Sequence, residues 1–149
     1  MQLEEEIAQK HFINPYHKAV VNIIYTNNWI TAFQNNLLKP YMVTVQQYNI
    51  LRILRGQHPK PATIKQIKER MLDKMSDASR LVEKLRLKGL VVRNICSSDR
   101  RNVDVLITQQ GLNLLTETDR HQLEMEKFMS KLRPEEIEEL NYLLNKLRS

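Results

Sequence analysis

Four polar or basic side chains lie close together in the middle of the chain, the last three at intervals of four residues: Ser79, Arg80, Lys84 and Lys88. Residues at such intervals can share one side of an α-helix, opposite its apolar side chains. Serine and arginine hydrogen-bond to base edges, whereas lysine attracts phosphates without reading sequence. Ser79 and Arg80, at the leading end, are therefore predicted to contact bases, and Lys84 and Lys88 to contact phosphates.

A second basic group follows within twelve residues, where Asp99 precedes Arg100 and Arg101. An arginine on a slender hairpin can enter a narrow A·T-rich minor groove, where the negative potential is enhanced. The neighbouring carboxylate can hold the guanidinium in one rotamer. A solvated hairpin tip is the alternative, but the helices upstream favour contact with DNA.

Charge is distributed unevenly over the 149 residues. The net charge is +6, and residues 60–105 carry 12 basic and 6 acidic side chains, which equals the whole surplus. A basic centre between less basic ends is typical of a module that binds a polyanion. A lysine-rich solvated face would give the same count, so charge alone leaves both interpretations open.

Two short helices joined by a turn are predicted to position the first group. Thr63 can cap a helix whose inward residues are Ile64, Ile67 and Met71, and residues 73–76 form the turn. The next helix places its inward residues at i, i+3, i+4 and i+7, and Gly89 follows where a left-handed cap is needed. Those inward residues are Ala78, Leu81, Val82 and Leu85. This pattern is typical of a helix-turn-helix.

The flanking segments predict a β-hairpin and long helices. Residues 90–96 and 103–108 read as two strands around a basic tip. Residues 17–38 form one helix that is apolar over a wide arc, which favours pairing with a second copy of the chain. Thr44 caps a helix from Val45 to about Arg55 that Gly56 ends, and residues 108–149 form two helices broken near Pro134.

Two stretches resemble the MarR family of bacterial transcription regulators. They are Ser79-Arg-Leu-Val-Glu-Lys-Leu-Arg-Leu-Lys-Gly-Leu-Val-Val-Arg93 and Asp99-Arg-Arg-Asn-Val-Asp-Val-Leu-Ile-Thr-Gln-Gln-Gly111. The resemblance implies a mainly α fold: a winged helix-turn-helix lobe with a small β-hairpin wing, between N- and C-terminal dimerisation helices. It implies one domain over residues 1–149, with the lobe at 44–108 and the dimerisation helices at 1–40 and 109–149.

The resemblance also assigns site residues. Asp99 and Arg101 match the wing pair, and Ser79 and Arg80 match recognition-helix positions. Ser76 and Asp77 complete the predicted DNA contacts, although Asp77 places an acidic group at the groove-facing end. It can accept a hydrogen bond from cytosine or cap the helix, and we favour capping.

Five aromatic residues are candidates for an effector pocket, since members of the family often bind phenolic or other lipophilic compounds. Packing in the core or in a dimer interface explains each of them equally well. The five are Tyr25, Trp29, Phe33, Tyr41 and Tyr48.

Other classes of function find little support. No Ser-His-Asp set, carboxylate pair or glycine-rich phosphate loop can be assembled, so we expect no enzyme and no cofactor. The histidines are scattered and lack metal-ligand spacing, and no run approaches the length of a membrane span. Cys96 could sense oxidants, but an inert thiol is the simpler interpretation. The histidines are His11, His17, His58 and His121.

The sequence therefore predicts a cytoplasmic, homodimeric regulator that binds double-stranded DNA at a pseudo-palindromic operator. We expect a repressor that a small effector can release. The alternative is a winged-helix module that binds protein or RNA and uses its basic face only for docking. A preferred DNA sequence and a steep salt dependence of affinity would separate the two.

Overall fold

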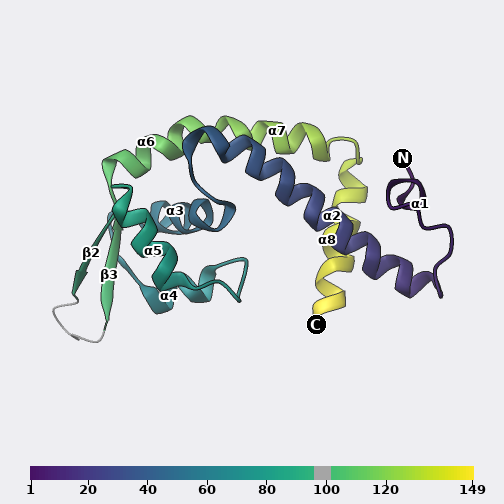
Figure 1. Ribbon diagram of the computed structural model, residues 1–149, viewed down its shortest axis with the longest axis horizontal. Helices are drawn as coiled ribbons and strands as arrows, with labels where there is room; N and C mark the ends of the chain where they lie inside the picture. Colours follow the sequence, from purple (N-terminus) through teal and green to yellow (C-terminus); the bar gives the residue numbers. More distant parts are fainter. Residues whose placement is uncertain (96–101) are drawn as a thin grey trace.

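A computed structural model of the protein describes residues 1–95 and 102–149 (Figure 1). A small lobe holds the short helices and the strands, and long helices extend from it toward one side. The elements are α1 (Leu3–Glu6), α2 (Pro15–Leu38), a 3-10 turn (Lys39–Tyr41), α3 (Val45–Gln57), β1 (Ala62–Thr63), α4 (Ile64–Arg70), α5 (Ala78–Leu87), β2 (Val91–Ile95), β3 (Val103–Ile107), α6 (Gln109–Thr118), α7 (Arg120–Met129) and α8 (Pro134–Arg148).

The lobe is a winged helix, as the sequence predicts. The helix-turn-helix consists of α4 and α5, and the hairpin strands β2 and β3 pair antiparallel from Val91 opposite Ile107 to Ile95 opposite Val103. A third strand, β1, completes a sheet of order β1-β3-β2. Strand β1 is not among the predicted strands, because two residues are too few to show alternation.

Threonine caps start the lobe helices where expected. The hydroxyls of Thr44 and Thr63 accept from the amides of Gln47 and Gln66, and both glutamine side chains return a bond to the cap backbone. This reciprocal capping box satisfies amides that the helix leaves without partners. The end of α3 differs from prediction, since the helix continues through Gly56 to Gln57 and is capped by His58.

The end of α5 requires a glycine. Gly89 has φ +74°, in the left-handed region, and its amide donates to the carbonyl of Arg86. The next amide, of Leu90, donates to the carbonyl of Leu85. This pair of bonds is a Schellman motif, which stops the helix and turns the chain into β2.

One hydrophobic core holds the lobe together and includes the predicted inward residues of the helices. It also takes in Leu38 from α2 and Leu115 from α6, so both long helical segments are anchored in the lobe. The fully buried large side chains include Ile50, Leu51, Leu54, Ile67, Met71, Val82, Leu85, Val91, Val105 and Leu115.

The C-terminal segment corrects the prediction of two helices. It contains α6, α7 and α8, and α6 meets α7 at Asp119 without glycine or proline. The carboxylate of Asp119 pairs with Arg55 of α3 at 3.0 Å, so a contact with the lobe accompanies the break. The start of α8 is as predicted, with Pro134 at its first position and Glu136 bonded to the backbone of Arg133.

The long helices expose many apolar side chains. Trp29 of α2 packs on Phe128 of α7 with ring centroids 4.1 Å apart, which joins these two helices. Outside this contact, α2 exposes Val20 and Ile24, and α8 exposes Leu143 and Leu147. None of the helices in the described ranges is both long and apolar enough to cross a membrane.

Candidate nucleic-acid interface

Helix α5 has one buried face and one free basic face. Ala78, Val82 and Leu85 are buried in the lobe, while Ser79, Arg80 and Lys84 are exposed on the opposite side. Within the described residues, the side chains of these three make no hydrogen bond or ion pair with the rest of the chain. They are therefore available to an external partner, as the sequence predicts.

Asp77 caps this helix. Its Oδ1 accepts from the backbone amide of Arg80 at 3.1 Å, which is the arrangement of an N-cap aspartate. The capping interpretation of Asp77 is confirmed. The same carboxylate lies at the positive end of the helix dipole, which offsets part of its repulsion of an approaching phosphate.

Two other predicted contact residues are engaged differently. The hydroxyl oxygen of Ser76 is buried and has no hydrogen-bond partner in the described part of the chain, so it is not presented to solvent. The ammonium of Lys88 donates to the carbonyl of Met42 and, at 2.9 Å, to Oε1 of Gln47. Met42 lies in the segment that joins α2 to α3, and Gln47 lies in the first turn of α3.

Glu83 neutralises two arginines beside the free face. Its carboxylate contacts Arg86 at 2.6 Å and Arg93 of β2 at 3.2 Å. The hydrogen bond from Arg86 lowers the pKa of Glu83 and raises the pKa of Arg86, so both groups stay charged. Neither Glu83 nor Arg93 is among the predicted contact residues, although an acid three residues before an arginine on one helix is a recognisable pair.

The wing is described only up to its tip. Asp99, Arg100 and Arg101 fall between β2 and β3 in the sequence, but these three residues, like Cys96, lie outside the described residues. The predictions for them remain predictions from the sequence.

The sequence and the fold are both similar to those of known proteins. A family model described as MarR family matches residues 43–102, which span the helix-turn-helix. The regulator MhqR of Bacillus subtilis (strain 168), described as HTH-type, is 25% identical over 119 residues, 79% of this chain and 81% of its own. A MarR transcription factor structure from Planctomyces limnophilus is 29% identical, covers 91% of this chain and 98% of its own, and has a TM-score of 0.68.

The winged-helix lobe matches the MarR family. A cysteine variant of MarR from E. coli, solved in complex with operator DNA, shares the fold at 23% identity and a TM-score of 0.75, with 99% of each chain covered. The family and the free face of α5 together identify this protein as a DNA-binding transcription regulator.

The five aromatic candidates for an effector pocket do not meet in one pocket. Tyr25 and Trp29 line a hollow beside α1, together with Phe128. Phe33 stacks on Trp29 at 6.3 Å between centroids, and Tyr41 meets the ring of His121 edge-on at 5.7 Å. Tyr48 alone of the five lines the pocket between the long helices and the lobe.

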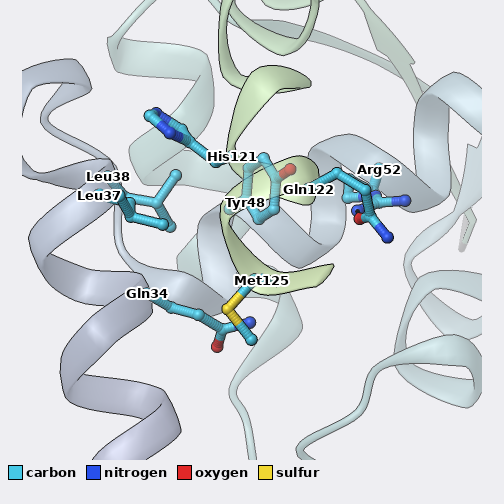
Figure 2. A pocket seen from close by; sticks show the side chains of 8 residues that line it. All are labelled: Gln34, Leu37, Leu38, Tyr48, Arg52, His121, Gln122 and Met125. Carbon is cyan, nitrogen blue, oxygen red and sulfur yellow. Dashed lines mark hydrogen bonds between the residues drawn. The ribbon is translucent and has the colours of Figure 1, made fainter. Parts of the chain in front are cut away.

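That pocket lies at the junction of α2, α3 and α7 (Figure 2). Its volume is about 50 Å³, well below the roughly 300 Å³ at which small-molecule sites usually begin. Nε2 of His121 is buried here without a hydrogen-bond partner among the described residues, and burial lowers the pKa of this histidine. The lining residues are Gln34, Leu37, Leu38, Tyr48, Arg52, His121, Gln122 and Met125.

No group of three or more histidine, cysteine, aspartate or glutamate residues within 1–95 and 102–149 is arranged to hold a metal ion. Glu83 and Asp119 are instead paired with arginines.

Proposed function

We propose that the protein is a homodimeric repressor that binds a pseudo-palindromic DNA operator. The observation that carries the proposal is the free face of α5, where Ser79, Arg80 and Lys84 lie exposed opposite a fully packed core face. A helix presented in this way fits the major groove, with its N-terminal residues against base edges.

We assign the second contact with DNA to the wing. Arg101 enters the minor groove on each side of the dimer, and Asp99 orients it, as the family resemblance implies. Arg100 is proposed to contact the adjacent DNA backbone. The lobe is proposed to span residues 44–108, and dimerisation is proposed for residues 1–40 and 109–149.

The exposed apolar surface supports the dimer. Ile24 is 56% exposed and Leu147 is 69% exposed, although both lie on well-formed helices. Such rows of apolar side chains on a single chain mark an interaction surface, and a second copy of the chain covers them most simply. The dimer then fixes the distance between the two recognition helices.

An effector is proposed to act at the junction pocket that Tyr48 lines. Because two lobes must reach two grooves together, a ligand that changes their separation weakens DNA binding. The pocket must enlarge, or be completed by the partner, to hold a phenolic compound. Of the predicted aromatic set, Tyr41 contributes through the ring of His121, whereas Tyr25, Trp29 and Phe33 are assigned to packing.

The test is selection of bound sequences from a random DNA duplex pool at physiological salt, with the oligomeric state measured in the same buffer. An enriched inverted repeat with half-sites about one helical turn apart supports the proposal. Arg101→Ala should then weaken operator binding, whereas Arg86→Ala, which removes an arginine already paired with Glu83, should change it little. Absence of any enriched sequence from a dimeric protein would instead favour the protein- or RNA-binding module.

A further inference from the structure

One side chain joins the C-terminal end of the recognition helix α5 to the segment that links α2 to α3 and to the first turn of α3. Lys88 follows the last residue of α5, and its ammonium donates to the carbonyl of Met42 and to Oε1 of Gln47. These acceptors precede Lys88 by 46 and 41 residues. One cation therefore connects the end of α5 to two neighbouring positions that are distant from it in sequence.

Both acceptors are held in place by their own surroundings. Met42 has φ 57°, a left-handed conformation that is uncommon outside glycine, and its amide donates to the carbonyl of Lys39 at 3.1 Å. Gln47 is only 3% exposed, and its Oε1 also accepts from the amide of Thr44 in the capping box. Lys88 thus meets two fixed oxygens at the point where α2 enters the lobe.

The backbone of Lys88, the donor, is also fixed by hydrogen bonds. The amide of Lys88 donates to the carbonyl of Lys84, and the Schellman motif of Gly89 and Leu90 fixes the backbone that follows. The side chain then spans from this fixed end to Met42 and Gln47. Of the three ammonium donors, two are used within the chain.

Lys84 provides the contrast on the same helix, one turn earlier. It is exposed and makes no hydrogen bond or ion pair within the described residues. Sequence spacing alone predicts that both lysines contact phosphates. The structure distinguishes them, because only Lys88 is bonded to acceptors within the chain.

We infer that Lys88 is a positioning residue, which fixes the angle of the recognition helix to the dimerising helix α2 and so sets the half-site spacing that the dimer accepts. Lys84, in contrast, neutralises a phosphate. This inference rests on the proposed function, because half-site spacing has meaning only for a dimer that binds two half-sites.

The first measurement is the salt dependence of DNA affinity for Lys88→Met and Lys84→Met. Each phosphate that a lysine neutralises contributes about 0.9 to the slope of log affinity against log salt concentration. Lys84→Met should reduce the slope by about 0.9, whereas Lys88→Met should leave it unchanged. A reduced slope in Lys88→Met would show a phosphate contact and overturn the inference.

The second measurement is spacing discrimination, which a purely structural role would not alter in a folded protein. Operators with one base pair added or removed between the half-sites move them by about 3.4 Å and rotate them by roughly 35°. Lys88→Met should lower the wild-type preference for native spacing by ~2- to 30-fold, the range in which residues that couple two sites act. Unchanged preference in folded Lys88→Met would overturn the inference.

Gln47→Glu keeps the inference testable if Lys88→Met does not fold. Glutamate preserves the capping box and draws the ammonium more strongly, so spacing discrimination and salt slope should both be kept. If Lys88 contacts a phosphate instead, the new carboxylate competes for the ammonium and the slope falls.

Two experiments separate the failure of this inference from the failure of the proposed function: selection of bound sequences tests the operator, and the salt titration on random duplex tests Lys88. A wild-type protein that enriches no inverted repeat contradicts the proposed operator. A salt slope that falls in Lys88→Met on the same duplex contradicts the role of Lys88.

Discussion

Gly111 lies against the carbonyl of Leu90 so closely that a Cβ on Gly111 would be 2.5 Å from that oxygen and 2.6 Å from Cγ1 of Ile107. Thr108 strengthens the same contact, since its hydroxyl donates to the carbonyl of Gly89 at 2.8 Å and its amide to that of Leu90 at 3.0 Å. The Lys-Gly-Leu and Ile-Thr-x-x-Gly motifs are therefore the two sides of one junction, where α6 packs on the turn that follows α5.

Gly111→Ala should destabilise the lobe because a methyl group has no space between two well-packed segments. Overpacking of this kind costs about 1–3 kcal/mol. Gly56→Ala is the matched control, since nothing lies within 4 Å of a Cβ at Gly56, and alanine in this helix should stabilise by up to about 1 kcal/mol. Urea unfolding at one fixed protein concentration measures both, and equal stability of the two variants would contradict the assigned packing.

Asp77 allows capping to be separated from DNA contact. Asp77→Ala should lower the free energy of unfolding by about 0.5–2 kcal/mol, because the amide of Arg80 loses its acceptor. Asp77→Asn keeps the cap and removes a negative charge near DNA, so stability should stay close to wild type and DNA affinity should rise. Loss of preference at a single cytosine in Asp77→Asn would instead assign base reading to this carboxylate.

The local features of the fold were predictable, and the long-range ones were not. Thr44, Thr63, Gly89 and Pro134 act within one turn of their own helix, so their types and neighbours are sufficient to place them. The break at Asp119 has no such local signal, because its partner Arg55 is 64 residues away.

The same limit applies to the candidate site. The free face of α5 follows from helical periodicity, since the apolar residues identify the buried side. The contacts of Lys88 with Met42 and Gln47, and the separation of the aromatic residues into different contacts, depend on how distant elements pack. A list of basic or aromatic positions contains no information about that packing.

Leu147 tests the proposed dimer surface. It is 69% exposed on α8, and a glutamate there would place a charge in the apolar interface. Leu147→Glu should raise the dimer dissociation constant by at least about tenfold while the helical circular dichroism of the lobe is kept, if burial of this side chain contributes about 1.5–3 kcal/mol. Sedimentation velocity over a range of concentrations gives the constant.

Asn141→Glu is the control for that experiment, because Asn141 is exposed on the same helix outside the apolar row. It adds the same charge, so a difference in the dimer dissociation constant between the two variants reflects the position of the charge. If both variants dimerise as wild type does, α8 has another role.

His121 gives the protein a pH-dependent stability whose sign follows from its surroundings. Burial is the largest cause that lowers the pKa of His121 from its ordinary value of 6.5, the charge of Arg120 lowers it further, and Glu124 opposes both. The unfolded chain therefore binds a proton at a higher pH than the folded chain. Stability is fully present above pH 6.5 and is lost as pH falls from there through the pKa of the folded state.

His121→Phe should remove this component of the pH dependence, because an apolar ring cannot take up the proton that the unfolded histidine binds. The free energy of unfolding, measured by urea at a series of pH values, should fall less steeply below pH 6.5 in the variant than in wild type. His11→Gln, at an exposed histidine, should leave the wild-type slope in place. A wild-type slope in His121→Phe would mean that other groups, and not this buried ring, make the fold sensitive to acid.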